Sequence, residues 1–278
     1  MANTLTGTPA AAAIYVQVRE HAAALDAPPC LAAVSVGAQP DDLAYLRSIA
    51  LSAEDCGITV RPVPLPADCA PEALTDTLRA LSTDGAVHGV LLLRPLPEAL
   101  RAQEILDTLD ARKDVDGMTT ASLGTLVTGA AGFAPCTAEA CMELLRAHGI
   151  DPAGRRVTIV GRSLVIGRPA ALLLTRADAT VTLCHRKTPD LAARCRDADI
   201  LLAAAGTPGL ITTDFVRPGQ IVFDAGATAL PDGTLRGDVA PDAAAIAVCT
   251  PVPGGIGSVT TALLLRHTVQ AAENLRHF

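Results

Sequence analysis

The sequence predicts an α/β protein of two domains, each built around a parallel sheet, and three observations support this. Short apolar runs alternate with longer stretches in which apolar residues recur at helical spacing. The chain has 278 residues, enough for one large domain or two modest ones, and 50% of them are hydrophobic, enough for real cores. In the second half, a glycine turn leads from an apolar run straight into a helical stretch, as in Rossmann-type domains.

The first half of the chain alternates strands and helices. Apolar runs predict strands at residues 31–37, 58–65 and 87–93, and helical spacing predicts helices at 43–56 and 71–81. Largely apolar strands that are separated by helices indicate a parallel sheet covered on both faces.

The second half repeats the alternation. We expect strands at 156–160, 179–184, 200–204, 221–224 and 246–249, and helices at 137–148, 167–177 and 258–275. We place residues 1–138 and 262–278 in an N-terminal α/β domain. Residues 139–261 are predicted to form a second, Rossmann-type domain.

Composition excludes several classes of partner. With 22 basic and 29 acidic residues the formal net charge is −7, which argues against binding nucleic acid or an anionic membrane. No apolar run reaches the roughly 18 residues of a membrane span, and the N-terminus lacks the basic start of a signal peptide. The eight cysteines form no CxxC pair, so we expect reduced thiols, no metal site and a cytoplasmic location.

Amines are scarce in this chain. Of the 22 basic residues only Lys113 and Lys187 are lysines, and the others are arginines. Any chemistry that requires an amine side chain therefore has two candidates.

The glycine turn predicts a nucleotide site. Gly161, Arg162 and Ser163 follow the strand at 156–160 directly, and Gly167 opens the next helix. Such a turn lets backbone N–H groups and a helix N-terminus approach a pyrophosphate. The spacing is GxSxxxG and not the GxGxxG of the common fingerprint, so a turn that needs glycine for its geometry alone is the alternative.

The end of the next strand indicates which nucleotide. His185, Arg186 and Lys187 follow Cys184, and no carboxylate stands among them. An acidic residue at this place binds the ribose of NAD, whereas basic residues accommodate the 2′-phosphate of NADP. We therefore predict NADP(H) as cofactor, with a solvated loop carrying incidental charges as the alternative.

Several segments together resemble one family over nearly the whole chain. It is the bifunctional methylenetetrahydrofolate dehydrogenase/methenyltetrahydrofolate cyclohydrolase family. The matching segments are TPVPGGIG at 250–257, KDVDG at 113–117, PCT at 135–137, PLP at 95–97, and the two halves of the glycine turn at 161–163 and 167–169.

The resemblance implies a fold, a reaction and a site. The family has two α/β domains with a cleft where nicotinamide and folate meet, and it commonly forms homodimers through the cofactor domain. Its reaction oxidises the methylene bridge of 5,10-methylenetetrahydrofolate and then hydrolyses the methenyl product. Carried over to this chain, Tyr45 and Asp116 are catalytic, and Pro253, Gly254 and Gly255 line the substrate pocket.

The chain departs from the family where the family's catalytic lysine stands. That lysine follows the tyrosine by four residues, but Ile49 is found there, and Leu93 replaces the glutamine of QLPLP that supports it. Isoleucine and leucine side chains have no ionisable or hydrogen-bonding group, so these two lining residues predict a drier, neutral pocket. Smaller departures are Met118 and Thr119 after the KDVDG match, and Ser258 after TPVPGGIG.

Three functional hypotheses follow. The leading one is an NADP-dependent oxidoreductase acting at a carbon–nitrogen centre, a methylenetetrahydrofolate dehydrogenase that has lost cyclohydrolase activity. The second is an NADPH-dependent reductase of a different cyclic imine or iminium, held by Asp116 and Tyr45. The third is a binding protein without catalytic activity that retains affinity for nucleotide or folate.

Overall fold

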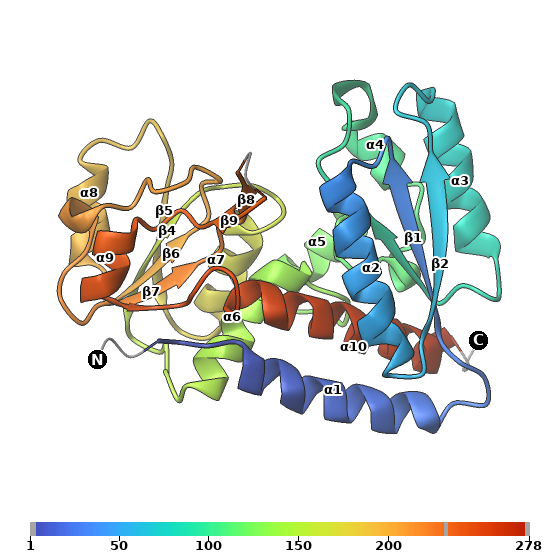
Figure 1. The fold of residues 1–278 in the computed structure, drawn as a ribbon, viewed down its shortest axis with the longest axis horizontal. Coiled ribbons are helices and arrows are strands. Elements are labelled where there is room, and N and C mark those ends of the chain that lie inside the picture. The colour runs from blue at the N-terminus through green and yellow to red at the C-terminus, as the bar shows by residue number, and fades with distance from the viewer. Residues whose placement is uncertain (1–3, 231–232, 276–278) are drawn as a thin grey trace. The chain divides into compact units, whose positions relative to one another are not determined.

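The computed structural model describes residues 4–230 and 233–275, which form two compact units (Figure 1). Among the described residues, 13–136 and 261–275 form the three-stranded unit, and 4–12, 137–230 and 233–260 form the five-stranded unit. Both contain parallel sheets and helices, which confirms the predicted fold class. Residues 4–12 group with the five-stranded unit, whereas we expected them in the first domain. The predicted limits at 1–3 and 276–278 lie outside the described residues.

The sheet of the three-stranded unit has the order β2-β1-β3, and all its strands are parallel. Its strands are β1 (Cys30–Val36), β2 (Thr59–Leu65) and β3 (Gly89–Leu92). The central part of β1 and the whole of β3 are buried, as expected for strands covered on both faces. The three predicted strands of this half are thus confirmed, with ends that differ by a few residues.

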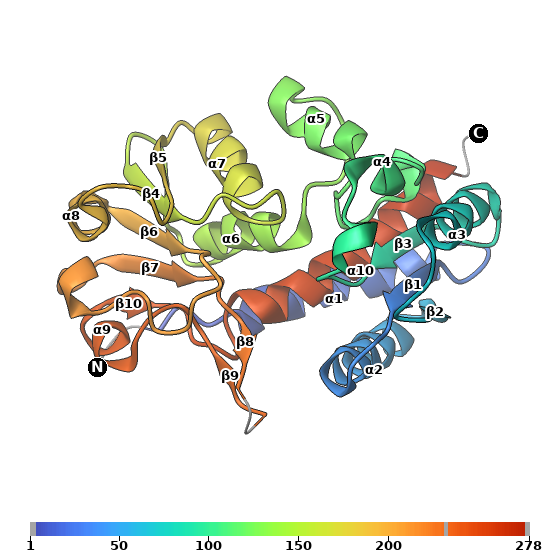
Figure 2. The same ribbon diagram turned by 90° about the horizontal axis from the view of Figure 1, so that it is seen from above.

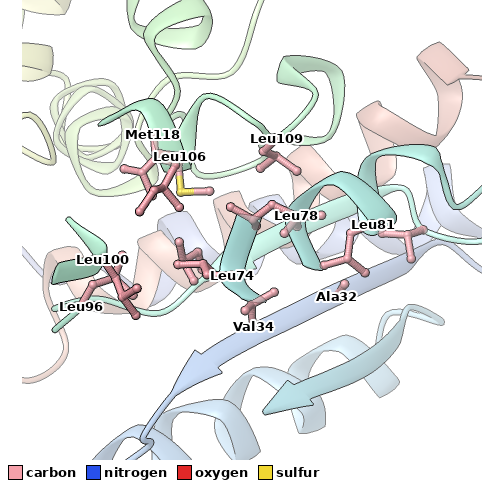
Figure 3. Packing of buried hydrophobic residues seen from close by; sticks show 14 residues of the cluster. Ala32, Val34, Leu74, Leu78, Leu81, Leu96, Leu100, Leu106, Leu109 and Met118 are labelled. Carbon is pink, nitrogen blue, oxygen red and sulfur yellow. The ribbon is translucent and has the colours of Figure 1, made fainter. Parts of the chain in front are cut away.

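Helices cover both faces of this sheet. Figure 2 shows α2 (Pro40–Glu54) and α3 (Pro71–Thr83) on opposite sides of it. In α3 the buried Leu74, Leu78 and Leu81 recur every three or four residues, so they share one helix face. Figure 3 shows this face packed toward β1, in a cluster of buried residues. Each of these leucines stabilises the fold by about 1.5–3 kcal/mol when buried.

Further helices complete this part of the chain. They are α1 (Thr8–Ala23), α4 (Gln103–Leu106), α5 (Thr120–Thr128) and α10 (Ile256–Leu275), with 3₁₀ turns at Glu98–Leu100 and Ala111–Lys113. The boundary between the two units falls within α1 and within α10. In the three-stranded unit these two helices run side by side and are joined by His21 and Glu273, 2.8 Å apart (Figure 1). We did not predict α1 or α5.

The sheet of the five-stranded unit has the order β10-β7-β6-β4-β5, also parallel throughout. Its strands are β4 (Arg156–Val160), β5 (Thr180–Cys184), β6 (Ile200–Ala203), β7 (Ile221–Asp224) and β10 (Val248–Cys249). The chain moves from β4 to β5 on one side and then returns to β6 on the other. The strand order therefore reverses at β4, and ligands of such sheets bind beyond the carboxyl ends of the strands at this point.

Helices flank this sheet as well. Figure 2 shows α6 (Cys136–Ala147) and α7 (Gly167–Arg176) on one side, with α8 (Leu191–Asp197) and α9 (Pro241–Ile246) on the other. A small antiparallel hairpin pairs β8 (Thr228–Ala229) with β9 (Leu235–Arg236). Within the described residues, no helix is both long enough and apolar enough to cross a membrane.

Candidate functional site

The glycine turn lies at the reversal point of the five-stranded sheet. Gly161 follows β4 with a φ of 127°, a conformation that L side chains rarely adopt. A Cβ atom at Gly161 would overlap the carbonyl oxygen of Ala204, and a Cβ atom at Gly167 would overlap that of Gly161. The Ser163 hydroxyl accepts a hydrogen bond from the Ile166 N–H at 3.1 Å. Backbone groups of the turn thus lie too close together for a side chain, and glycine is required at both positions.

This turn fits the pyrophosphate of a dinucleotide. It leads into the N-terminus of α7, where the helix dipole attracts an anion. Arg162 and Ser163 are exposed beside it. The geometry therefore provides both a close backbone approach and a basic side chain.

The basic segment after β5 is also exposed. Arg186 and Lys187 follow the strand in a turn closed by His185, whose Nδ1 accepts the Lys187 N–H at 3.2 Å. In the described part of the chain, no acidic side chain forms an ion pair with Arg186 or Lys187. Their charges are thus available to a phosphate.

Two buried aspartates order the loops at this end of the sheet, and the sequence analysis missed both. Asp238 accepts hydrogen bonds from the N–H groups of Ala205, Gly206 and Thr207 at 2.6–3.0 Å, which fixes the loop after β6. Asp224 ends β7 and accepts N–H groups from the segment around Asp238. Burial raises the pKa of Asp224, although these N–H groups oppose the shift. An aspartate at the end of an apolar strand is the signal that could have revealed Asp224.

The KDVDG segment anchors the candidate substrate site of the three-stranded unit. The buried amine of Lys113 donates to the carbonyl oxygens of Leu81 and Asp84 at 3.0 and 2.7 Å. Burial lowers the pKa of this amine. The Asp114 carboxylate accepts the N–H groups of Met118 and Thr119. Lys113 and Asp114 are therefore committed to holding the loop that presents Asp116.

Gly117 brings this loop against the segment before α6. It has a φ of 60°, and a Cβ atom there would lie 2.6 Å from the Pro135 nitrogen. The close approach lets Oδ1 of Asp116 accept the N–H of Cys136 at 3.4 Å. The two motifs, KDVDG and PCT, thus meet at one carboxylate.

Arg94 is the other partner of this carboxylate. Its Nη2 lies 2.6 Å from Oδ2 of Asp116. Arg94 comes two residues after β3 and Asp116 follows the 3₁₀ turn at 111–113, so the contact joins neighbouring segments of the fold. Arg94 was not among the predicted site residues. Its position just beyond the carboxyl end of a parallel strand is the signal that could have revealed it.

Tyr45 completes the Asp116 cluster, by which we mean Tyr45, Arg94, Asp116, Cys136 and Thr261. Burial raises the pKa of its hydroxyl, and the Asp116 charge raises it further, while a hydrogen bond with Thr261 opposes the shift. The residue as a whole is nevertheless 42% exposed. At neutral pH this hydroxyl is protonated and can donate a hydrogen bond.

The other predicted pocket residues fall into two groups. Ile49 lies one turn after Tyr45 in α2 and is fully buried, while Leu93 directly precedes Arg94 and is half-buried. Pro253, Gly254 and Gly255 belong to the five-stranded unit, where the Gly7 N–H donates to the Gly254 carbonyl oxygen. The structure thus brings Tyr45 together with Asp116 within one unit, and it holds the glycine turn in the other. Among the described residues, no group of three or more His, Cys, Asp or Glu side chains is arranged to hold a metal ion.

Family models match both halves of the chain. The model for the catalytic domain of tetrahydrofolate dehydrogenase/cyclohydrolase covers residues 5–116. The model for the NAD(P)-binding domain of the same family covers residues 135–276. The chain belongs to the tetrahydrofolate dehydrogenase/cyclohydrolase family. The resemblance inferred from the motifs is thereby confirmed at the level of the family.

Relatives of this family match along almost the full length. The chain is 47% identical over 279 residues to bifunctional protein FolD 1 of Rhodococcus jostii, covering 98% of this chain and 93% of the relative. It is 42% identical to bifunctional protein FolD of Moorella thermoacetica, with 98% and 99% covered.

Solved structures of the same family agree with the fold. The bifunctional FolD enzyme of Campylobacter jejuni superposes with a TM-score of 0.92 at 37% identity, covering 98% of this chain and 99% of that one. The Trypanosoma brucei dehydrogenase–cyclohydrolase, solved with NADP and an inhibitor, superposes with a TM-score of 0.91 at 35% identity, with 98% of both chains covered. Together with the NAD(P)-binding domain, this confirms the predicted cofactor, NADP(H).

Proposed function

We propose that this chain is an NADP-dependent dehydrogenase of 5,10-methylenetetrahydrofolate that hydrolyses the methenyl product weakly or not at all. The activities for which the relatives are named support a folate substrate over a different cyclic imine, and over a binding protein without activity. The loss of hydrolysis is supported by one observation on this chain. The position one helical turn after Tyr45 carries a fully buried isoleucine, Ile49.

Neither lysine of the chain compensates for Ile49. The Lys113 amine is bonded to two backbone carbonyls, and Lys187 follows β5 in the five-stranded unit. Arg94 is a cation paired with Asp116, but a guanidinium stays protonated and is a poor proton shuttle. General acid–base catalysis contributes about 10²- to 10⁴-fold to such a hydrolysis, so its loss has a large effect.

The dehydrogenase reaction has smaller demands. When bound, NADP⁺ supplies a hydride acceptor, and the protein's task is to hold the two reacting carbons close and oriented. The glycine turn from Gly161 to Gly167 binds the pyrophosphate, and Arg186 and Lys187 bind the 2′-phosphate. Asp116 accepts hydrogen bonds from the pterin, and the Tyr45 hydroxyl donates from beside it. None of these roles requires an acid–base group at position 49.

Two assays on the purified chain test the proposal. NADP⁺ reduction with methylenetetrahydrofolate should proceed, and hydrolysis of methenyltetrahydrofolate should not exceed the uncatalysed rate by much. The double variant Ile49→Lys/Leu93→Gln should gain hydrolysis by about 10²-fold or more, because it restores an amine and its supporting amide.

A matched variant serves as the control for this test. Ile49→Met, paired with Leu93→Gln, has a similar volume without the amine and should gain nothing. Hydrolysis by the unaltered chain at a rate close to its dehydrogenase rate would show that the proposed loss is wrong. If no NADP⁺ is reduced, but a cyclic imine is reduced with NADPH, the folate assignment is wrong instead.

A homodimer and a cytoplasmic location also stay predictions. The first can be checked by light scattering of the purified chain, and the second by fractionating cells that express it. A monomer in solution would contradict the expectation drawn from the family.

A further inference from the structure

The Arg94–Asp116 pair sets a donor group and an acceptor group side by side. Nη2 of Arg94 lies 2.6 Å from Oδ2 of Asp116, and the two side chains are 23% and 18% exposed. The QLPLP motif that this segment resembles has leucine at the Arg94 position. The Arg94 guanidinium alters what the Asp116 carboxylate offers to a substrate.

Both partners keep unused hydrogen-bonding capacity. A guanidinium has five N–H donors, and Asp116 engages one nitrogen of Arg94. In the described part of the chain, no buried side-chain nitrogen or oxygen lacks a partner, so the remaining N–H groups of Arg94 reach solvent. Among the described residues, the donors to the Asp116 carboxylate are Arg94 and, over a long 3.4 Å, the Cys136 N–H. A carboxylate has about four lone-pair sites, so acceptor capacity remains beside the donors.

The charge of the pair selects against charged ligands. Arg94 and Asp116 together are neutral, so a carboxylate ligand would meet the Asp116 charge and an amine would meet the Arg94 charge. A neutral group that presents a carbonyl oxygen next to an N–H satisfies both partners at once. This arrangement of atoms is the edge of a cyclic amide.

We propose that Arg94 and Asp116 together bind the cyclic amide edge of the substrate, with Arg94 donating to its carbonyl oxygen and Asp116 accepting from the adjacent N–H. The inference rests on the proposed function, because the pterin ring of a tetrahydrofolate carries such an edge. Arg94 is then a specificity residue that touches the substrate directly.

A matched pair of ligands tests this assignment. Folate has the amide edge, whereas in aminopterin an amino group replaces the carbonyl oxygen and the adjacent ring nitrogen has no hydrogen. Dissociation constants are measured by calorimetry on the full chain with NADP⁺ present. The unaltered chain should prefer folate by about 10- to 100-fold, the size expected for hydrogen bonds to charged groups.

Substitutions of Arg94 separate its role from simple folding effects. Arg94→Leu should reduce the preference for folate at least tenfold, and Arg94→Lys, which retains a donor, should restore part of it. Arg61→Leu is the control, because it removes another Arg–Asp pair of the same unit, Nη2 of Arg61 to Oδ2 of Asp84 at 2.9 Å. This variant should keep the preference unchanged.

The outcomes distinguish this inference from the proposed function. An equal preference in the unaltered chain and in Arg94→Leu, or no preference in the unaltered chain, overturns the role of Arg94. Turnover of methylenetetrahydrofolate is measured in parallel on the same samples. Turnover with a preference independent of Arg94 leaves the proposed function standing, and a preference that depends on Arg94 without turnover leaves only the inference standing.

Discussion

Lys113 illustrates how a residue in a motif can be unavailable for chemistry. Only 4% of it is exposed, and its amine bonds to the carbonyl oxygens of Leu81 and Asp84. The two carbonyls belong to the end of α3 and the segment after it, so the amine ties this helix to the loop that carries Asp116. The motif therefore keeps a lysine for positioning, and we propose that no amine takes part in chemistry at Ile49.

We expect Lys113→Met to lower the free energy of unfolding by about 2–4 kcal/mol. The substitution keeps much of the side-chain volume but leaves two backbone carbonyls without their donor. Urea unfolding followed by circular dichroism measures the change. The control is Lys187→Met without NADP, which should change stability by less than about 0.5 kcal/mol because Lys187 is exposed. Equal losses in the two variants would contradict the assigned role.

At the level of elements, Asp107 supports the start of α5. Its carboxylate accepts the N–H and the hydroxyl of Thr120 at 2.7 and 2.6 Å, and the Gln103 amide at 2.9 Å. Burial tends to raise the pKa of Asp107, but these hydrogen bonds outweigh burial and lower it below its usual value of 3.8. Helix α5 follows the loop that presents Asp116, so this contact also steadies the candidate site.

Asp107→Asn should lower the free energy of unfolding by about 1 kcal/mol at neutral pH, a size limited by the exposure of Asp107. Because the folded-state pKa lies below the unfolded one, the contribution is present above a pH of 3.8 and is lost as the pH falls through the folded-state pKa. The stability difference between the two proteins should therefore shrink in acid. Urea titrations at neutral pH and at about pH 3 measure it. A difference that stays constant would argue against a role for the carboxylate charge.

The loop after β6 is a second element held by one carboxylate. Asp238 is fully buried and accepts three consecutive backbone N–H groups from residues 205–207. The loop begins one strand away from the glycine turn, at the carboxyl ends of the strands where a dinucleotide binds. Its shape is thus set by a residue more than thirty positions later in the chain.

Asp238→Asn should raise the KM for NADP⁺ several-fold and lower the free energy of unfolding by about 2–3 kcal/mol, since an amide cannot accept all three N–H groups as well as a carboxylate can. Steady-state kinetics and urea unfolding give the two values. Because Asp238 holds the loop at the nucleotide site, the KM for NADP⁺ should change more than the KM for the folate. A change in the folate KM alone would show that the loop does not serve the nucleotide.

For the molecule as a whole, we propose that one unit binds the substrate and the other binds the cofactor. The Asp116 cluster lies in the three-stranded unit, and the glycine turn with the basic segment lies in the five-stranded unit. On this proposal, nucleotide selectivity depends on residues that take no part in the Asp116 cluster. This separation makes the two properties testable by independent substitutions.

The double variant Arg186→Gln/Lys187→Gln should raise the KM for NADP⁺ by about 10- to 100-fold and leave the weaker use of NAD⁺ nearly unchanged, because only NADP⁺ carries the 2′-phosphate. Initial rates with both nucleotides measure the effect. Arg146→Gln removes an exposed arginine of α6 as a control and should alter neither value. A parallel loss with both nucleotides would assign these residues to something other than the 2′-phosphate.

Much of the fold could be predicted because its signals are local. The eight expected strands and the glycine turn rest on runs of apolar residues and on glycines within a few positions of each other. Helix α1 escaped prediction because its alanine-rich sequence shows no clear apolar face. Helix α5 is short and begins with the capping contacts of Thr119, which are weak signals in a sequence.

The candidate site likewise has a part that local sequence signals predicted and a part that only the folded structure shows. Motifs identified Tyr45, Asp116 and the glycine turn, and the register of α2 showed that Ile49 follows Tyr45 by one turn, since helical spacing is a property of the chain itself. The pairing of Arg94 with Asp116, across 22 positions, and the three N–H groups gathered by Asp238 appear only once the strands are ordered. Hydrogen bonds act over about 3 Å, so the partner of a carboxylate is decided by which segments the folded sheets bring that close together.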